Sequence, residues 1–230
     1  MNKRLSMFGY SPSSVTCLPY DLPDAPLLEP SAEAARCMVF VPSGIMVVIG
    51  KGSDPALELN KDTILADGIP VLRRGTGGCA VVLTRDMMAV SFSISSDTQL
   101  KSSEYFRLFN ETVIRALKAQ GISGLHHAGT SDIALENRKI AGTAIYRNRN
   151  LIFYHAIINV AGNTDLIERY LSIPPRLPAY REGRRHSDFV TSLQAAGYQI
   201  RLAEFQKDVE REFAATLRHI ALLLSRVSVK

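Results

Sequence analysis

The feature that most constrains the fold is a series of short apolar runs, rich in valine and isoleucine and bounded by glycine, proline, aspartate or serine. Runs of this length and composition are typical of short β-strands separated by turns. Because the runs are apolar along most of their length, we expect strands that are covered on both faces. The expected strands are residues 38–41, 44–49, 71–72, 80–83, 89–94, 133–135, 139–145 and 151–160, and a turn at 147–150 joins the last two.

Three segments have the periodicity of helices. Apolar side chains recur at helical spacing in residues 103–120, and Gly121 follows where a left-handed C-cap would lie. Residues 165–171 are expected to form a short helix. Residues 204–226 carry one apolar stripe, which indicates a long amphipathic helix on a core. Residues 1–31 have little periodicity and frequent proline, so they predict an irregular lead-in.

Length and composition favour a single domain over residues 1–230. Of these 230 residues, 46% are hydrophobic, which is ordinary for a globular protein with a core. The sequence shows no internal repeat and no linker after residue 40, and we expect no separate accessory domain. The longest apolar run, residues 45–49, is far too short to span a bilayer, so no membrane association is expected.

Charge and cysteine content favour a soluble, cytoplasmic protein. The formal net charge of +5 could favour acidic partners, but it comes without the long basic tract typical of nucleic-acid binding. Cys17, Cys37 and Cys79 form no C-x-x-C pair, so neither a disulfide framework nor a cysteine zinc site is indicated. The acid-free, serine-containing start of the chain leaves an organelle transit segment as the alternative.

The stretch LRRGTGGCAVVL, residues 72–83, places two arginines and three glycines before an expected strand. Its Gly75-x-Gly77-x-x-Ala80 spacing matches a dinucleotide fingerprint, but that fingerprint must open a helix. The nearby IGKGS, residues 49–53, resembles a phosphate loop with the wrong glycine spacing. Neither nucleotide motif is therefore indicated.

Glycines still let consecutive backbone amides converge on an anion. Arg73 and Arg74 add donors that can grip a phosphate or a carboxylate in a fork. The alternative is a glycine-rich hairpin with solvated arginines.

A second candidate segment, residues 129–160, centres on Lys139. Apolar neighbours and the small residues that follow indicate that its ammonium group points into a confined space, where it needs a counter-charge. The alternative is a surface ion pair with Glu136 or Asp132.

Together with VVIGKGSDPALELN at 47–60, these two segments resemble the lipoate-protein ligase and octanoyltransferase family, which shares its catalytic domain with biotin protein ligases. The resemblance spans about residues 45–195. It implies an α+β fold of the biotin/lipoate ligase catalytic-domain type, similar to class II synthetases, with a mixed, largely antiparallel central sheet flanked by helices.

The resemblance also implies a site. The arginine-glycine loop matches the family's loop around acyl chain and nucleotide, Lys139 matches the lysine that contacts acyl carboxylate and α-phosphate, and His155 matches a strand histidine. Glu58 and Asn60 resemble the family's Glu-x-Asn, and residues 180–193 its basic segment. The candidate binding residues are Arg73, Arg74, Thr76, Gly77, Gly78, Cys79, Ala80, Asp132, Ala141, Gly142 and His155, with Lys139 as the catalytic residue.

The sequence departs from the family's pattern at four positions: Cys79 replaces the third glycine of the loop, Leu83 a frequent histidine, Ser53 a glutamine, and Ser131 an asparagine. The function implied is a ligase that activates lipoate or octanoate with ATP and Mg²⁺ to an acyl adenylate. The ligase then transfers the acyl group to a lysine of an acidic lipoyl-domain protein. A separate accessory subunit is a further expectation, because the tail after residue 195 has room for little beyond its helix.

Two other functions stay open. In an octanoyl or lipoyl transferase using an acyl-carrier donor, a cysteine would form a thioester, and Cys79 is the candidate. The transferases' own Pro-Cys-Gly motif falls nearest to Ile173, Pro174 and Pro175, which lack a cysteine. The second alternative is a non-catalytic protein of the same fold that binds lipoyl domains or nucleotide.

Nucleic-acid and metal binding are not expected. Acidic residues interrupt the basic cluster of Arg181, Arg184, Arg185 and His186, and no aromatic stacking platform accompanies it. We expect this cluster to dock an acidic carrier domain or to complete the pocket, with a solvated turn as the alternative. No carboxylate or thiol stands at ligand spacing from the adjacent histidines 126 and 127, so they are expected to be structural.

Overall fold

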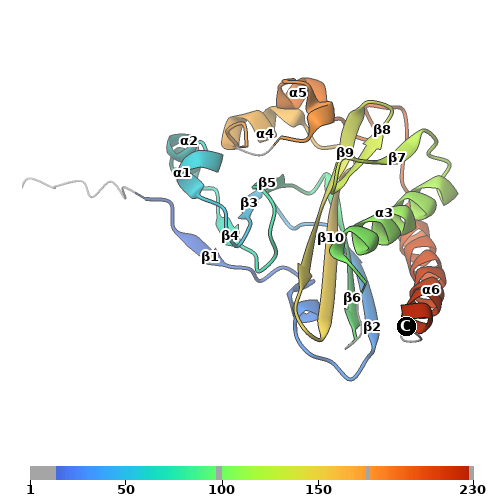
Figure 1. Cartoon of the computed structure of the whole chain (residues 1–230). Helices are drawn as coiled ribbons and strands as arrows, with labels where there is room; N and C mark the ends of the chain where they lie inside the picture. The colour runs from blue at the N-terminus through green and yellow to red at the C-terminus, as the bar shows by residue number, and fades with distance from the viewer. Residues whose placement is uncertain (1–13, 97–99, 175–176, 228–230) are drawn as a thin grey trace, which may run out of the picture.

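The computed structural model describes residues 14–96, 100–174 and 177–227. For residues 226 and 227 it describes the backbone alone. Residues 1–13 of the expected lead-in and Pro175 of the tripeptide named above lie outside the described residues. The described chain forms two sheets, with helices on the outer side of each (Figure 1).

The larger sheet has six strands, and every pairing in it is antiparallel. Its spatial order is β2 (Ala35–Phe40), β6 (Met87–Ser95), β10 (Leu151–Asn159), β9 (Arg138–Arg147), β8 (Asp132–Leu135) and β7 (Leu125–Ala128). Since side chains alternate between the two faces of a strand, one face of β6 and β10 carries Phe92 and Tyr154, whereas the other carries Ser91 and His155.

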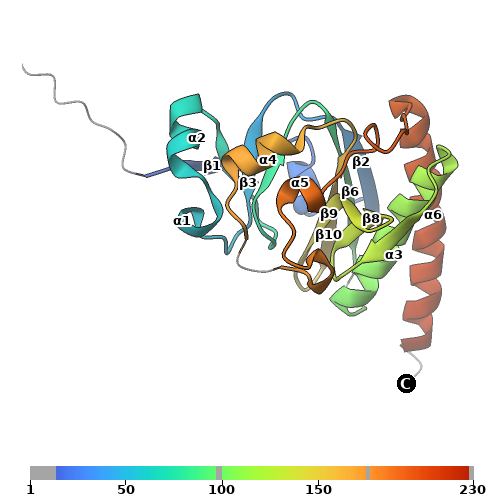
Figure 2. The ribbon, with the colours of Figure 1, turned by 90° about the horizontal axis from the view of Figure 1, so that it is seen from above.

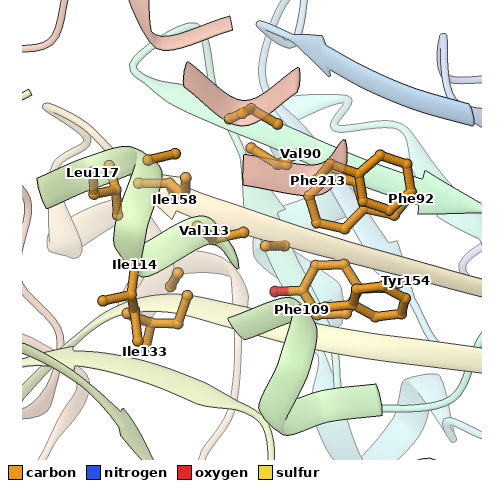
Figure 3. Close-up of a cluster of buried hydrophobic side chains, with 14 of the residues drawn as sticks. Val90, Phe92, Phe109, Val113, Ile114, Leu117, Ile133, Tyr154, Ile158 and Phe213 are labelled. Carbon is orange, nitrogen blue, oxygen red and sulfur yellow. The ribbon is translucent and has the colours of Figure 1, made fainter. Parts of the chain in front are cut away.

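Two long helices, α3 (Ser102–Ala119) and α6 (Leu202–Val227), cover the first of these faces. Figure 3 shows their aromatic and aliphatic side chains meeting those of the sheet, and the rings of Phe92 and Phe213 stack with centroids 4.4 Å apart. Burying each such side chain stabilises the fold by roughly 1.5–3 kcal/mol. The helices therefore fix the sheet from one side and leave its other face for the site.

The smaller sheet has the order β1 (Cys17–Pro19), β4 (Val71–Arg73), β3 (Met46–Ile49) and β5 (Val81–Leu83). Strand β4 runs parallel to β1 and β3, whereas β5 is antiparallel to β3. An apolar cluster that includes Met46, Val48 and Met87 joins this sheet to the second face of the larger one.

The remaining elements are short, and Figure 2 shows α1 and α2 at the opposite side of the molecule from α3 and α6. They are η1 (Ala25–Leu28), α1 (Pro55–Glu58), α2 (Lys61–Asp67), α4 (Thr164–Tyr170), η2 (Ala179–Arg181) and α5 (His186–Phe189). Ile64 of α2 and Tyr170 of α4 pack with Val47 and Val71 of the smaller sheet. Within the described part of the chain, every helix is too short or too polar to cross a membrane.

The α+β fold with a mixed, largely antiparallel sheet is confirmed. Each expected strand and helix has a counterpart, and Gly121 has the expected left-handed backbone, with φ 84°. The prediction that the whole lead-in is irregular is wrong, because residues 17–19 form β1 and residues 25–28 form η1. Strand β7 and helices α1, α2 and α5 were not predicted, since none exceeds seven residues and β7 contains two histidines.

Candidate functional site

An irregularity in strand pairing brings Lys139 and Asp132 to one face of the larger sheet. Asp132 of β8 lies opposite Gly142 of β9, but Ala134 lies opposite Lys139, so Ile140 has no partner in β8. In a regular strand Lys139 would share a face with Ala141. The extra residue reverses this and places Lys139 on the same side as Asp132 and Gly142.

The lysine and the aspartate form a close ion pair, with Nζ 2.7 Å from Asp132 Oδ1. The Asp132 side chain is 7% exposed and that of Lys139 is 28% exposed. The hydroxyl of Tyr180 donates to the other carboxylate oxygen at 2.8 Å. Both oxygens of Asp132 are thus engaged, and the pair lies in a sheltered position rather than on an open surface.

Gly142 makes room for the lysine. A β-carbon at this position would lie 3.0 Å from Lys139 Nζ and 3.1 Å from Cε, tighter than ordinary packing. Ala141, predicted as a site residue, instead faces the helix-covered core and is 1% exposed. The bulge therefore assigns Gly142 to the site and removes Ala141 from it.

The glycine loop connects β4 to β5 and is held from within by Arg74. The buried guanidinium donates from Nη1 to Val48 O at 3.1 Å and from Nη2 to the carbonyls of Gly77 and Cys79, both at 2.9 Å. Its Nε donates to Thr76 Oγ1 at 2.8 Å. Burial lowers the pKa of Arg74 to about 10, so the group stays charged at neutral pH.

Arg73 has a similar role on the other side of the loop. Its Nη1 donates to the carbonyl oxygens of Gly50 and Ser53, both at 3.1 Å. Irregular backbone leaves carbonyls without ladder partners, and the two guanidinium groups satisfy several of them. Most of the hydrogen bonds that the two arginines make go to backbone carbonyls, and the role of both arginines in anion binding stays a prediction.

The turn at residues 50–53 lies directly against the glycine loop. Lys51 N donates to Thr76 O at 2.9 Å, and a β-carbon at Gly50 would overlap the carbonyl oxygen of Gly78. Glu58, from α1, accepts from Ala80 N at 2.5 Å and anchors the far end of the loop. The Ala80 side chain packs toward the outer core of the smaller sheet, so this candidate turns away from the site.

His155 of β10 contacts the loop from the larger sheet. Its Nε2 lies 3.2 Å from Thr76 Oγ1, and its Nδ1 lies 3.8 Å from Asp24 Oδ2, too far for a hydrogen bond. Burial, the largest influence, and the charge of Arg74 lower the pKa of His155, while Asp24 acts in the opposite direction.

Asp24 is completely buried and comes from the predicted lead-in. Ser91 Oγ donates to Oδ2 at 2.6 Å, and Tyr20 OH donates to Oδ1 at 2.7 Å. Burial alone would raise the pKa of the carboxyl, but His155, Ser91 and Tyr20 outweigh burial and lower the pKa below its usual value. Sequence reasoning missed Asp24, because no motif or periodicity surrounds it.

Strand β9 brings the two motifs together. Lys139 Nζ lies beside Gly142, and a β-carbon at Gly78 would lie 3.8 Å from Ala144 Cβ. Gly142 and Ala144 are alternate residues on one face of β9, about 7 Å apart. The ammonium group and the glycine loop therefore adjoin the same strip of sheet.

The basic segment 180–193 lies against Asp132 and Lys139. The guanidinium groups of Arg181 and Arg184 bind each other's backbone carbonyls and lie over the ring of Phe189. Thr191 N donates to Lys139 O at 2.9 Å. The segment therefore contacts both members of the ion pair, and Tyr180, its first residue, is a site residue that sequence reasoning did not single out.

His127 has structural partners, since its Nδ1 lies 2.9 Å from Asn110 Nδ2 and its Nε2 lies 3.0 Å from Gly129 O. Among the residues that the structure describes, no three His, Cys, Asp or Glu side chains are grouped so that they could hold a metal ion.

Residues 26–214 match the family model described as the lipoyl protein ligase A/B catalytic domain. Lipoate–protein ligase 1 of Staphylococcus aureus (strain Mu50 / ATCC 700699) is 30% identical over 129 residues, which cover 56% of this chain. They cover 38% of that relative, so the chain matches well under half of its length.

Two solved structures share the fold. One is a bi-partite lipoate protein ligase, studied with its E2 lipoyl domain, from Thermoplasma acidophilum: TM-score 0.69, 22% identity, 81% of this chain and 72% of that chain covered. The other is a lipoate-protein ligase A bound with ATP: TM-score 0.68, 22% identity, 81% of this chain and 74% of that chain covered.

Replacing Gly50 by alanine is expected to separate the two loops, because the added carbon would collide with backbone rather than with a movable side chain. We expect Gly50→Ala to lower the free energy of unfolding by about 1–3 kcal/mol. Gly52→Ala is the matched control, because no atom lies within 4 Å of its added carbon. Urea denaturation of both variants measures the difference, and equal stabilities would contradict this account of the loop.

The lowered pKa of His155 makes stability depend on pH. Below pH 6.5 the unfolded histidine takes up a proton that the folded protein resists, so the free energy of unfolding falls as the pH falls. The slope from one such group approaches about 1.4 kcal/mol per pH unit. We expect His155→Gln to flatten this dependence just below pH 6.5, while buried His186 keeps a contribution of the same sign.

Denaturation curves recorded at several pH values measure the slope. His126→Gln, at an exposed position, is the control and should keep the wild-type slope. An unchanged slope in His155→Gln would show that this histidine does not titrate as its environment requires.

Proposed function

The chain belongs to the lipoyl protein ligase A/B catalytic domain family, and from that premise we propose that it is an ATP-dependent lipoate-protein ligase. It would convert lipoate or octanoate to an acyl adenylate and transfer the acyl group to a lysine of a lipoyl-domain protein. One observation carries the proposal: the Lys139 ammonium group and the glycine loop adjoin the same strip of β9.

Lys139 would bind the carboxylate of the acid and the α-phosphate of ATP. A free carboxylate does not acylate an amine at neutral pH, because its oxygen is a poor leaving group, whereas an adenylate supplies a phosphate leaving group. A fixed positive charge placed between the reacting groups stabilises the charge that develops during this exchange. The ion pair with Asp132 orients the ammonium group beforehand.

The glycine loop would bind phosphate oxygens through its backbone amides. Arg74 binds carbonyls of the loop and Arg73 binds carbonyls of the neighbouring turn, so the two arginines shape this backbone. Arg74 also adds fixed positive charge beneath it. This division of roles supports phosphate binding by backbone, with Cys79 contributing its carbonyl to the framework.

The carboxylates at the site do not fit a protein-held Mg²⁺. Magnesium sites in proteins usually use one or two carboxylates together with substrate phosphates. Asp132 is occupied by Lys139 and Tyr180, Glu58 by the Ala80 amide, and Asp24 by Ser91 and Tyr20. We therefore assign no step of the reaction to a metal bound by these residues.

The partners proposed are a lipoyl-domain acceptor and a separate accessory subunit. The Thermoplasma acidophilum ligase is described as bi-partite and was studied with an E2 lipoyl domain, which supports both. The formal net charge of +5 favours an acidic acceptor. We further propose that residues 1–230 form one catalytic domain that works in the cytoplasm.

Lys139→Ala is expected to remain folded and to lower acyl transfer at least 100-fold, the usual cost of removing one charge-stabilising group. Mass spectrometry of a lipoyl-domain acceptor, after incubation with ATP and either lipoate or octanoate, measures the transfer. Lys118→Ala, on the exposed surface of α3, is the matched control and should react as wild type. Wild-type-like modification by Lys139→Ala would end the proposal.

The transferase alternative depends on Cys79, which directly follows the glycines and has a partly accessible side chain. For a ligase we expect Cys79→Ser to keep ATP-dependent modification within about threefold of wild type, since serine conserves size and leaves the backbone carbonyl in place. The same mass-spectrometric assay, with acyl-carrier thioester replacing ATP and free acid, tests the alternative. Loss of transfer in Cys79→Ser together with activity on the thioester would favour the transferase.

A non-catalytic protein of the same fold would give neither pyrophosphate exchange nor acceptor modification with any of these donors. That result would remove the ligase and the transferase together.

A further inference from the structure

Asp24 belongs to the segment before β2, yet it lies beneath the glycine loop on the inner face of the larger sheet. Its side chain is 0% exposed, and Ser91 and Tyr20 hold its two oxygens. The ring of His155 lies above it, followed by the hydroxyl of Thr76. A fully buried carboxylate has a large desolvation cost, so this position calls for an explanation.

The donors around Thr76 fix the direction of the hydrogen bonds. Arg74 Nε can only donate, so Thr76 Oγ1 accepts from it at 2.8 Å. The hydroxyl hydrogen of Thr76 is then free to point to His155 Nε2 at 3.2 Å. An Nε2 that accepts this hydrogen carries no proton, so the proton of the neutral ring lies on Nδ1.

Nδ1 faces Asp24. No hydrogen-bond partner satisfies this buried atom among the described residues, and the nearest charge is Asp24 Oδ2 at 3.8 Å. The charged and titratable groups around the ring are Asp24 on one side and Arg74 on the other, with Tyr20 bound to Asp24. The negative charge next to Nδ1 favours a proton there, and the positive charge beyond Nε2 disfavours one.

We propose that Asp24 is a positioning residue, whose carboxylate holds His155 in the Nδ1-protonated tautomer so that Nε2 accepts from Thr76 and fixes the glycine loop. The role of Asp24 in acyl transfer rests on the function proposed above. Its effect on the tautomer of His155 is independent of that function. A carboxylate is required because it only accepts hydrogen bonds. Tyr20 and Ser91 donate to its two oxygens, and the Nδ1 proton faces it at longer range, so an amide would turn its N–H groups toward one of these hydrogens.

The test is ¹⁵N NMR of the imidazole nitrogens at pH 8, where His155 is neutral. The His155 signals are identified by their absence in His155→Gln. In the wild type we expect the nitrogen shifts of an Nδ1–H ring, and in Asp24→Asn those of a ring with a substantial Nε2–H population. Asp21→Asn removes the same charge at an exposed neighbouring position and is the matched control, expected to leave the shifts unchanged.

A second variant leaves Asp24 intact and tests the proposal by the same NMR measurement if Asp24→Asn does not fold. Thr76→Val removes the hydroxyl while keeping the shape of the side chain. If Asp24 holds the tautomer, the Nδ1–H ring persists in Thr76→Val. Wild-type shifts in a folded Asp24→Asn, or loss of the Nδ1–H ring in Thr76→Val, would overturn the proposal.

Acyl transfer separates this inference from the proposed function. We expect Asp24→Asn to lower kcat/KM about 10- to 100-fold, because a change of tautomer takes the Nε2 acceptor away from the buried Thr76 hydroxyl, and Asp21→Asn to leave it unchanged. A tautomer change in Asp24→Asn with no acyl transfer by the wild type would remove the ligase proposal alone. A ligase whose kcat/KM is unaffected in Asp24→Asn would remove the positioning role alone.

Discussion

The arrangement of the site depends on the buried guanidinium of Arg74. Its donors reach the carbonyl of Val48 in β3 and two carbonyls of the glycine loop, and its Nε holds the hydroxyl of Thr76. Burying this charge is costly unless its donors are satisfied, and in the loop they largely are. The same contacts order the backbone of the glycine loop, which has no helix or sheet hydrogen bonds of its own. This group thus ties the glycine loop to strand β3 of the smaller sheet.

The second element of the site is a change of register in the larger sheet. One extra residue in β9 decides which side chains face the glycine loop. It places Lys139 on the face of the sheet that points away from the helix-covered core. Gly142 then leaves space for the ammonium group, while Asp132 and Tyr180 hold the counter-charge from two other segments. The lysine is thus positioned by its neighbours on three separate stretches of chain.

Much of this could be predicted from the sequence, because local patterns report local structure. The apolar runs located the strands, and the position of Lys139 among small residues indicated a sheltered ammonium group. The sequence could not predict that Ala141 faces the helix-covered core, because the position of a bulge is set by pairing with the neighbouring strand. The backbone partners of Arg73 and Arg74 could not be predicted, because loop carbonyls that need donors are not visible in a sequence. Asp24 was missed for a similar reason: two of its neighbours, Ser91 and His155, lie far along the chain.

The position of Asp24 has a consequence for how the molecule is made. It contacts a histidine from the other half of the chain, and the helix α6 that completes the core against β6 comes last. Contacts between such distant parts of a sequence form slowly and late. During synthesis the Asp24 carboxylate therefore stays hydrated until the segment that carries His155 has left the ribosome.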